Sequence, residues 1–192
     1  MQSSLQPTLI QNLWPQKSRH VQIAQVVMGS LLVALAAQVT IPLPFSPVPI
    51  TGQTFAVLLA AALLGGRGGA AALLLYLAEG AVGLPVFAGG LGGPAVLLGP
   101  TAGYLYGFVV AAFVVGRLCE RGWDRRPRSA AAAMLLGNAI IYGFGLPWLA
   151  TFVGVENVLT LGLLPFIPGD LFKLALAALS LPLSWKLLAK NG

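Results

Sequence analysis

The sequence predicts an all-α integral membrane protein, with six transmembrane helices and irregular extracellular loops. Of the 192 residues, 57% are hydrophobic and 8% are charged, roughly a third of the charged fraction of a soluble domain. The apolar residues form runs of membrane-crossing length, and the basic residues concentrate between particular runs. So few charges cannot cover a surface that faces water, which excludes an ordinary soluble domain and a disordered chain.

Six apolar runs follow one another along the chain, and each crossing of a bilayer needs about 20 residues. Proline and glycine separate the runs because they interrupt regular helix, and the second run is short for a crossing. We expect residues 1–20 to form a polar cytoplasmic tail, 21–187 the six-helix membrane domain and 188–192 a cytoplasmic C-terminal tail. The expected spans are residues 21–41, 50–64, 70–84, 101–118, 129–153 and 168–185.

The distribution of basic residues supports six crossings and predicts the orientation. Ten of the eleven Lys and Arg residues lie before the first run, between the second and third, at the junction of the fourth and fifth, or after the sixth. Six crossings put all these segments on one side, and the exception is Lys173. Because cytoplasmic loops collect Lys and Arg, both termini are expected in the cytoplasm. This pattern explains the net charge of +6 without a nucleic-acid partner.

The same topology places three long connections outside the cell, at residues 42–49, 85–100 and 154–168. They are rich in proline and glycine, which the connections on the cytoplasmic side do not need. Irregular backbone near membrane depth is tolerated only where protein buries it or where it lines a cavity. We therefore expect a binding site at the extracellular face.

Apart from the basic residues assigned to the cytoplasmic ends, three charged side chains fall within or at the edge of the expected spans: Glu79, Asp170 and Lys173. Ionisable groups in a membrane are costly and are candidates for functional sites. A spacing of three puts Asp170 and Lys173 on one helix face. Either Asp170 caps the helix with Lys173 as its ion-pair partner, or the two face a small polar ligand. Glu79 is either protonated or paired across the bundle.

Two further sets of residues have two interpretations each. Ser30, Ala34 and Ala37 are small residues at helical spacing, which lets helix backbones approach closely, either inside the bundle or against a partner protein. Aromatic residues near the ends of spans are either interface anchors or walls of a ligand site. The aromatic candidates are Phe87, Tyr104, Tyr106, Tyr142 and Trp148.

Several catalytic and energy-coupling motifs are missing from the sequence. One histidine and one cysteine exclude a histidine-rich metal site and an intrachain disulfide. The chain also lacks a GxxxxGK[ST] phosphate-binding loop and an acidic cluster of the kind that holds Mg²⁺. Active transport would therefore need a partner that supplies energy, and an intramembrane enzyme is disfavoured.

Four motifs occur in order along the chain: VPITGQT at 48–54, GLPVFAGGLGG at 83–93, GPTAGY at 99–104 and FIPGDLFK at 166–173. Together they resemble the signatures of the BioY family, the biotin-binding S-components of energy-coupling-factor (ECF) transporters. The resemblance implies the S-component fold, in which six helices form a site that opens to the outside and is covered by the outer loops.

The resemblance also implies that Asp170 and Lys173 hold the ureido ring of biotin. A ureido group offers N–H donors to a carboxylate and a carbonyl acceptor to an ammonium, which suits biotin as the ligand. We expect no cofactor and no metal. Two positions that can be polar in the family are Leu91 and Leu105 here, so backbone N–H groups of the glycine loop are expected to hold the carboxylate of biotin. The expected binding residues are Gln53, Phe87, Gly89, Gly90, Tyr142, Trp148, Asp170 and Lys173.

Partners and location follow from the same resemblance. It implies a subunit for high-affinity biotin uptake in the plasma membrane of a prokaryote, working with a membrane coupling protein and a pair of ATPases. Ser30, Ala34 and Ala37 are then expected to dock the coupling protein. The alternatives are an S-component for another small vitamin, an intramembrane enzyme, and a membrane protein that binds no vitamin.

Overall fold

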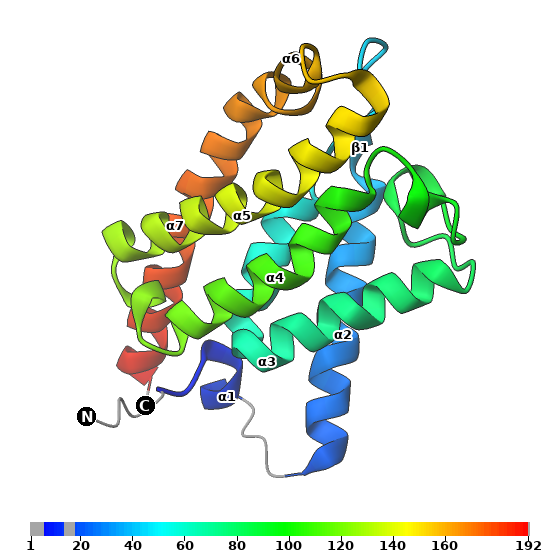
Figure 1. Cartoon of the computed structure of the whole chain (residues 1–192). Helices are drawn as coiled ribbons and strands as arrows, with labels where there is room; N and C mark the ends of the chain where they lie inside the picture. The colour runs from blue at the N-terminus through cyan, green and yellow to red at the C-terminus, as the bar shows by residue number, and fades with distance from the viewer. Residues whose placement is uncertain (1–5, 14–17, 192) are drawn as a thin grey trace.

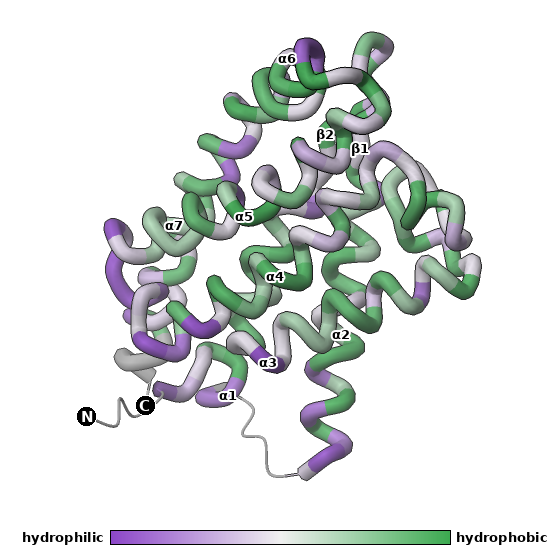
Figure 2. Tube along the Cα trace, viewed as in Figure 1, coloured by the Kyte–Doolittle hydropathy of each residue, from purple (hydrophilic) through white to green (hydrophobic). Residues whose placement is uncertain are grey.

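The computed structural model describes residues 6–13 and 18–191, except for the side chains of residues 13 and 188–191. Within these residues, five helical segments are long and apolar enough to cross a membrane. They form one bundle (Figure 1), in which hydrophobic residues follow the helices and hydrophilic residues gather mainly near helix ends (Figure 2). The long helices are α2 (Arg19–Gln38), α3 (Gln53–Ala81), α4 (Ala102–Cys119), α5 (Pro127–Val153) and α7 (Ile167–Asn191).

Helix α3 covers most of the second and third predicted spans, and the chain reverses direction within it at Gly65. This residue has φ 77° and ψ −179°, a conformation that is open to glycine and strained for other residues. The Nε2 of Gln53 donates to the hydroxyl of Tyr76 at 2.7 Å, so the two halves of α3 lie side by side. Counting them separately gives the six helices that the sequence predicts.

The reversal at Gly65 is completed by a side chain from the end of α4. A new helix leaves its first N–H groups without intrahelical partners, and Glu120 Oε1 accepts from the N–H of Gly66 at 2.9 Å. The other oxygen of Glu120 forms an ion pair with Arg117 at 3.0 Å. A Cβ atom on Gly116 would lie 2.3 Å from the backbone of Gly65, so a glycine is needed there for α4 to approach the break.

The bundle core forms around α3, which packs against α2 on one side and α4 on the other. Helix α4 in turn packs against α5, and α5 against α7. Small residues bring these helices together: a Cβ on Gly107 would lie 3.1 Å from the backbone of Ile141, and one on Gly137 would clash with Leu58 and Val115. Close backbone approach through small residues is the usual packing mode of helices in lipid.

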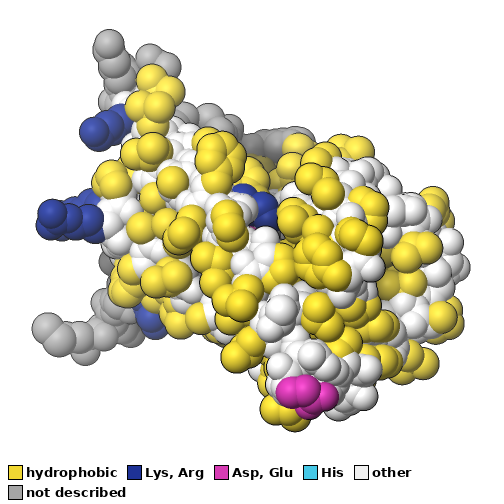
Figure 3. Space-filling view, turned by 90° about the horizontal axis from the view of Figure 1, so that it is seen from above, with side chains coloured by type: hydrophobic (Ala, Val, Ile, Leu, Met, Phe, Trp, Pro, Cys, Tyr) yellow, Lys and Arg dark blue, Asp and Glu magenta, His cyan; other side chains and the backbone are white. Residues whose placement is uncertain are grey.

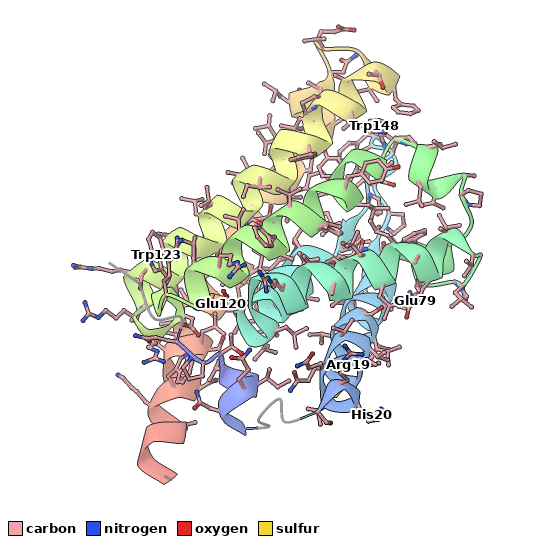
Figure 4. The ribbon with its side chains drawn as sticks, turned by 60° about the horizontal axis from the view of Figure 1, so that its bottom comes forward. Arg19, His20, Glu79, Glu120, Trp123 and Trp148 are labelled. Atoms are coloured by element: carbon pink, nitrogen blue, oxygen red, sulfur yellow. The ribbon has the colours of Figure 1, made fainter. Side chains whose placement is uncertain are left out.

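One end of the bundle carries irregular structure, and we call it the hairpin end. Its hairpin pairs β1 (Thr40–Ile41) antiparallel with β2 (Ile50–Thr51). The opposite end, called the basic end, carries Arg19, Glu120 and Trp123 (Figure 4). The remaining elements of the hairpin end are η1 (Ala88–Gly90), η2 (Val96–Leu98), α6 (Val158–Gly162) and η4 (Leu164–Phe166), and η3 (Trp123–Arg125) lies at the basic end.

Both segments predicted as tails contain regular structure where the structure describes them. Within the expected tail of residues 1–20, Leu9–Leu13 form helix α1, which packs against α3, and Leu9 is buried. The N–H of Gln6 donates to the carbonyl of Glu120 at 2.8 Å, which ties this segment to the end of α4. Helix α2 already begins at Arg19, and α7 continues through residues 188–191. Residues 1–5, 14–17 and 192 lie outside the described residues.

Candidate binding site

A cavity of about 380 Å³ lies at the hairpin end, within the size range of small-molecule sites. Seen from above, the surface over this end is largely hydrophobic, with basic atoms recessed near its centre (Figure 3). The walls come from the β1–β2 hairpin, the 86–101 segment, η4 and helices α3, α4, α5 and α7. The polar lining consists of Thr51, Gln53, Thr54, Thr101, Tyr104, Tyr142, Asp170 and Lys173.

Lys173 reaches the cavity from the second turn of α7 and is held by two neighbouring elements. Its ammonium donates to the carbonyl of Thr51 at 2.8 Å and to the hydroxyl of Thr54 at 2.9 Å. It also lies 3.4 Å from Asp170 Oδ1. The ammonium therefore has a defined position beside the carboxylate, at the junction of β2, α3 and α7.

Asp170 accepts hydrogen bonds from across the bundle. The Tyr142 hydroxyl on α5 donates to its Oδ2, and the Thr54 hydroxyl on α3 lies 3.5 Å from its Oδ1. No described hydrogen bond joins Asp170 to a backbone N–H of α7, although it stands in the first turn of that helix. The interpretation of Asp170 as a simple helix cap is therefore not supported, whereas a charged pair facing a cavity is.

Aromatic rings form much of the remaining wall. Tyr104 and Tyr142 meet edge to face with ring centroids 6.2 Å apart, and the Tyr104 hydroxyl donates to the carbonyl of Gly162 at 2.9 Å. Phe87 is almost completely buried and lies where a Cβ on Gly80 would collide with its ring at 2.0 Å. Such a wall suits an apolar chain or ring whose polar end reaches Asp170.

Gln53 is held at the cavity by residues that the sequence analysis did not single out. Its Oε1 accepts from the Thr51 hydroxyl at 3.2 Å, and its Nε2 donates to the hydroxyl of Tyr76. Tyr76 is fully buried and donates to the carbonyl of Val86 at 3.2 Å. It therefore links Gln53 to the segment that carries Phe87. Thr51 lies within the VPITGQT motif, but no sequence signal marks Tyr76.

Comparisons with known proteins agree with this geometry. The family model described as "BioY family" matches residues 10–190, nearly the whole chain. This chain belongs to the BioY family. Its curated relatives include "Biotin transporter BioY" of Rhizobium etli, 41% identical over 82% of this chain and 88% of the relative. The relative "Biotin transporter BioY" of Thermotoga maritima is 40% identical over 82% of this chain and 92% of its own length.

A solved structure shares the fold of this BioY chain. It is the S-component for biotin from an ECF-type ABC transporter, with a TM-score of 0.73 and 25% sequence identity. The match covers 88% of this chain and 92% of the other. The expected S-component architecture is thereby confirmed.

Three of the residues expected at the binding site of this BioY chain do not line the cavity. Gly89 and Gly90 both have positive φ and form the tight turn η1, while Ala88 and Leu91 on either side face the cavity. Trp148 lies behind the wall, where its indole N–H donates to the carbonyl of Gly99 at 2.9 Å. These residues shape the wall and do not face a ligand directly.

The small-residue stripe predicted for partner docking is also corrected. Ser30 and Ala37 are 0% exposed and Ala34 is 8% exposed, because this face of α2 packs on α3. The Ser30 hydroxyl donates to Glu79 Oε2 at 2.5 Å. The stripe is therefore internal packing, and Glu79 has a structural partner. The spacing of small residues could not show which neighbour they approach.

Residues suited to a metal do not gather anywhere in 6–13 and 18–191. Within these residues no three His, Cys, Asp or Glu side chains lie close enough to hold an ion. The charged chemistry of the cavity consists of one carboxylate and one ammonium, Asp170 and Lys173. Such a pair can bind a neutral group that both donates and accepts hydrogen bonds.

Proposed function

We propose that this chain is the substrate-binding membrane subunit for biotin uptake. The observation that carries the proposal is the Asp170–Lys173 pair, which faces a cavity with otherwise largely apolar walls. The ureido N–H groups of biotin donate to Asp170, and the ureido carbonyl accepts from Lys173. Such charge-assisted hydrogen bonds are strengthened by low local polarity.

The rest of the biotin molecule fits the remaining wall. The thioether ring and the valeryl chain are apolar and polarizable, and they pack well against aromatic and aliphatic side chains. Tyr104, Phe108, Phe166 and Leu105 supply such surfaces from α4 and η4. The subunit binds its substrate and does not transform it, as the transporter names of its relatives support.

Transport needs energy that this sequence has no motif to supply. The solved neighbour is described as the S-component of an ECF-type ABC transporter. By this relationship the chain works with a membrane coupling protein and a pair of ATPases. Docking of the coupling protein does not use Ser30, Ala34 and Ala37, which are buried.

The membrane is the plasma membrane of a prokaryote, with the hairpin end outside and both termini in the cytoplasm. The concentration of Arg and Lys at the basic end supports this orientation. Cys119 is buried, so the test uses Cys119→Ala chains with one cysteine introduced at exposed Arg128 or Glu156. A membrane-impermeant thiol reagent should label Glu156→Cys in intact cells and Arg128→Cys only in inverted vesicles. Labelling of Arg128→Cys from outside would reverse the orientation.

Equilibrium binding of labelled biotin to the purified chain in detergent tests the function itself. We expect saturable binding of about one biotin per chain. A vitamin without a ureido group, such as thiamine, should not compete. Absence of saturable biotin binding, or equal competition by thiamine, would contradict the proposal.

A further inference from the structure

We propose that this chain recognises biotin by its ureido end alone, and that biotin amides, which lack the carboxylate charge, bind as tightly as biotin. The inference rests on the proposed function, because it concerns the same cavity. It names the substrate class: ureido-ring compounds whose side chain ends in either an acid or an amide.

The charges of the cavity are all at one end. Among the described residues that line it, Asp170 and Lys173 are the charged ones, and they lie 3.4 Å apart. The ammonium already donates to the Thr51 carbonyl and the Thr54 hydroxyl. The Lys173 ammonium therefore lies at the site proposed for the ureido ring, where Asp170 balances its charge. No further positive charge remains in the lining for the carboxylate of biotin.

The other end of the cavity is apolar and open. It is formed by the 86–100 segment, which lies on the opposite side of the molecule from α7 (Figure 1). Leu91 lines it with 57% of its surface exposed, and Ala95 is an exposed lining residue as well. A chain that extends from the charged pair towards Leu91 therefore places its terminal group where water can reach it.

Several backbone donors of the 86–100 segment are used within it. The N–H of Gly90 donates to the carbonyl of Phe87, that of Val96 to Gly93 and that of Gly99 to Val96. These groups cannot anchor a carboxylate without breaking bonds that shape the loop.

The N–H groups of the exposed lining residues Leu91 and Ala95 have no described hydrogen-bond partner, but water reaches them and they suit a carboxylate oxygen and an amide oxygen alike. A buried charge without partners is costly, so the carboxylate of biotin stays in water at the opening. Its charge there contributes little to the free energy of binding.

The experiment is competition against labelled biotin with unlabelled biotin, biotinamide and the N-methyl amide of biotin. We expect both amides to bind within about threefold of biotin, since a solvated end group contributes little. 2-Iminobiotin, in which the ureido oxygen is replaced by nitrogen, should bind more than about 30-fold more weakly, because the Lys173 ammonium loses its acceptor. Amides that bind more than about 30-fold more weakly than biotin would overturn the inference, and so would equal binding of 2-iminobiotin. Failure of biotin itself to bind would instead refute the proposed function.

A matched pair of variants locates the carboxylate end. Leu91→Arg places a cation at the opening, and Leu98→Arg places one at a residue that is 68% exposed and does not line the cavity. Leu91→Arg should favour biotin over biotinamide by about two- to fivefold, the range of an exposed ion pair, and should lose this preference in high salt. Leu98→Arg should leave the ratio unchanged. The same ratio in both variants would place the carboxylate elsewhere and overturn the inference.

Discussion

Two buried carboxylates, one at each end of the bundle, differ in what surrounds them. Asp170 at the hairpin end is 7% exposed and Asp124 at the basic end is 0% exposed. Asp170 accepts a hydrogen bond from the Tyr142 hydroxyl and lies beside the Lys173 ammonium. Asp124 accepts the indole N–H of Trp185 at 2.6 Å, and its Oδ1 has no partner among the described residues.

The comparison shows that burial of a carboxylate does not by itself indicate a ligand site. Asp124 joins η3 to the last turns of α7, where the guanidinium of Arg125 lies 4.4 Å from the ring centroid of Trp185. Desolvation by burial raises the pKa of Asp124, while the hydrogen bond from Trp185 acts to lower it. Asp170 differs in facing an open cavity beside an opposite charge. That combination is why we propose the hairpin end as the binding site, whereas Asp124 at the basic end holds η3 against α7.

The largest expected effect is the loss of the ammonium at the hairpin end. Lys173→Met keeps the length of the stem but removes the donor to the ligand and leaves Asp170 unpaired. Biotin affinity should fall by about 2–4 kcal/mol, or about 30- to 1000-fold, as measured by calorimetric titration. A folded variant that keeps wild-type affinity would remove the distinction between the two ends.

At the basic end, Gly65→Ala should lower stability without changing the site. An alanine would be forced into a conformation suited to glycine, and its Cβ would lie 2.4 Å from Glu120 Oε1. We expect a loss of about 2–4 kcal/mol in unfolding free energy, measured by denaturation in detergent. Gly143→Ala is the matched control, because α5 has open space at that Cβ and alanine favours helix. Equal stability of the two variants would mean that the reversal at Gly65 does not depend on glycine.

A smaller effect is expected from Tyr76→Phe, which changes the support of the site and none of its lining residues. The variant loses the hydroxyl that accepts from Gln53 and donates to Val86. One hydrogen bond is worth about 0.5–1.5 kcal/mol, so biotin should bind roughly 2- to 12-fold more weakly. Unchanged affinity with a lower melting temperature would assign Tyr76 to folding alone.

The pH dependence of stability gives the smallest expected effect and sharpens the comparison. Because the pKa of Asp124 is raised in the folded state, folding is favoured when this group is protonated and loses stability as pH rises through the raised pKa. Asp124→Asn remains neutral throughout. The melting temperature of the wild type relative to this variant should therefore fall as the pH rises above about 4, the ordinary pKa range of an aspartate. A difference that stays constant as the pH rises would show that Asp124 ionises without cost.

Much of the fold could be predicted because lipid imposes simple rules on sequence. The apolar runs and the one-sided basic residues predicted six helices, and the structure has them with a reversal confined to Gly65. The pair Asp170 and Lys173 stood out because charges are rare in spans. The break was expected to extend from Gly65 to Gly69, but only the first of these glycines leaves the helical conformation.

The predictions that failed concern residues whose type suits several different surroundings in a folded bundle. Ser30 and the alanines after it are small, and only the position of the returning half of α3 shows that they face inward. Trp148 is an aromatic residue near the end of a span, but its indole N–H donates to the carbonyl of Gly99 behind the cavity wall. Thr54 was missed because its partners, Asp170 and Lys173, are more than a hundred residues away in sequence.

The most direct test of the account is a biotin titration of Asp170→Asn beside Asp124→Asn, both purified in detergent and shown to be folded. The two substitutions are chemically identical and remove one buried negative charge at opposite ends of the bundle. The account predicts that Asp170→Asn loses about 30- to 1000-fold in affinity and that Asp124→Asn stays within about threefold of the wild type. Wild-type affinity in Asp170→Asn, or an equal loss in both variants, would contradict the assignment of the hairpin end as the biotin site.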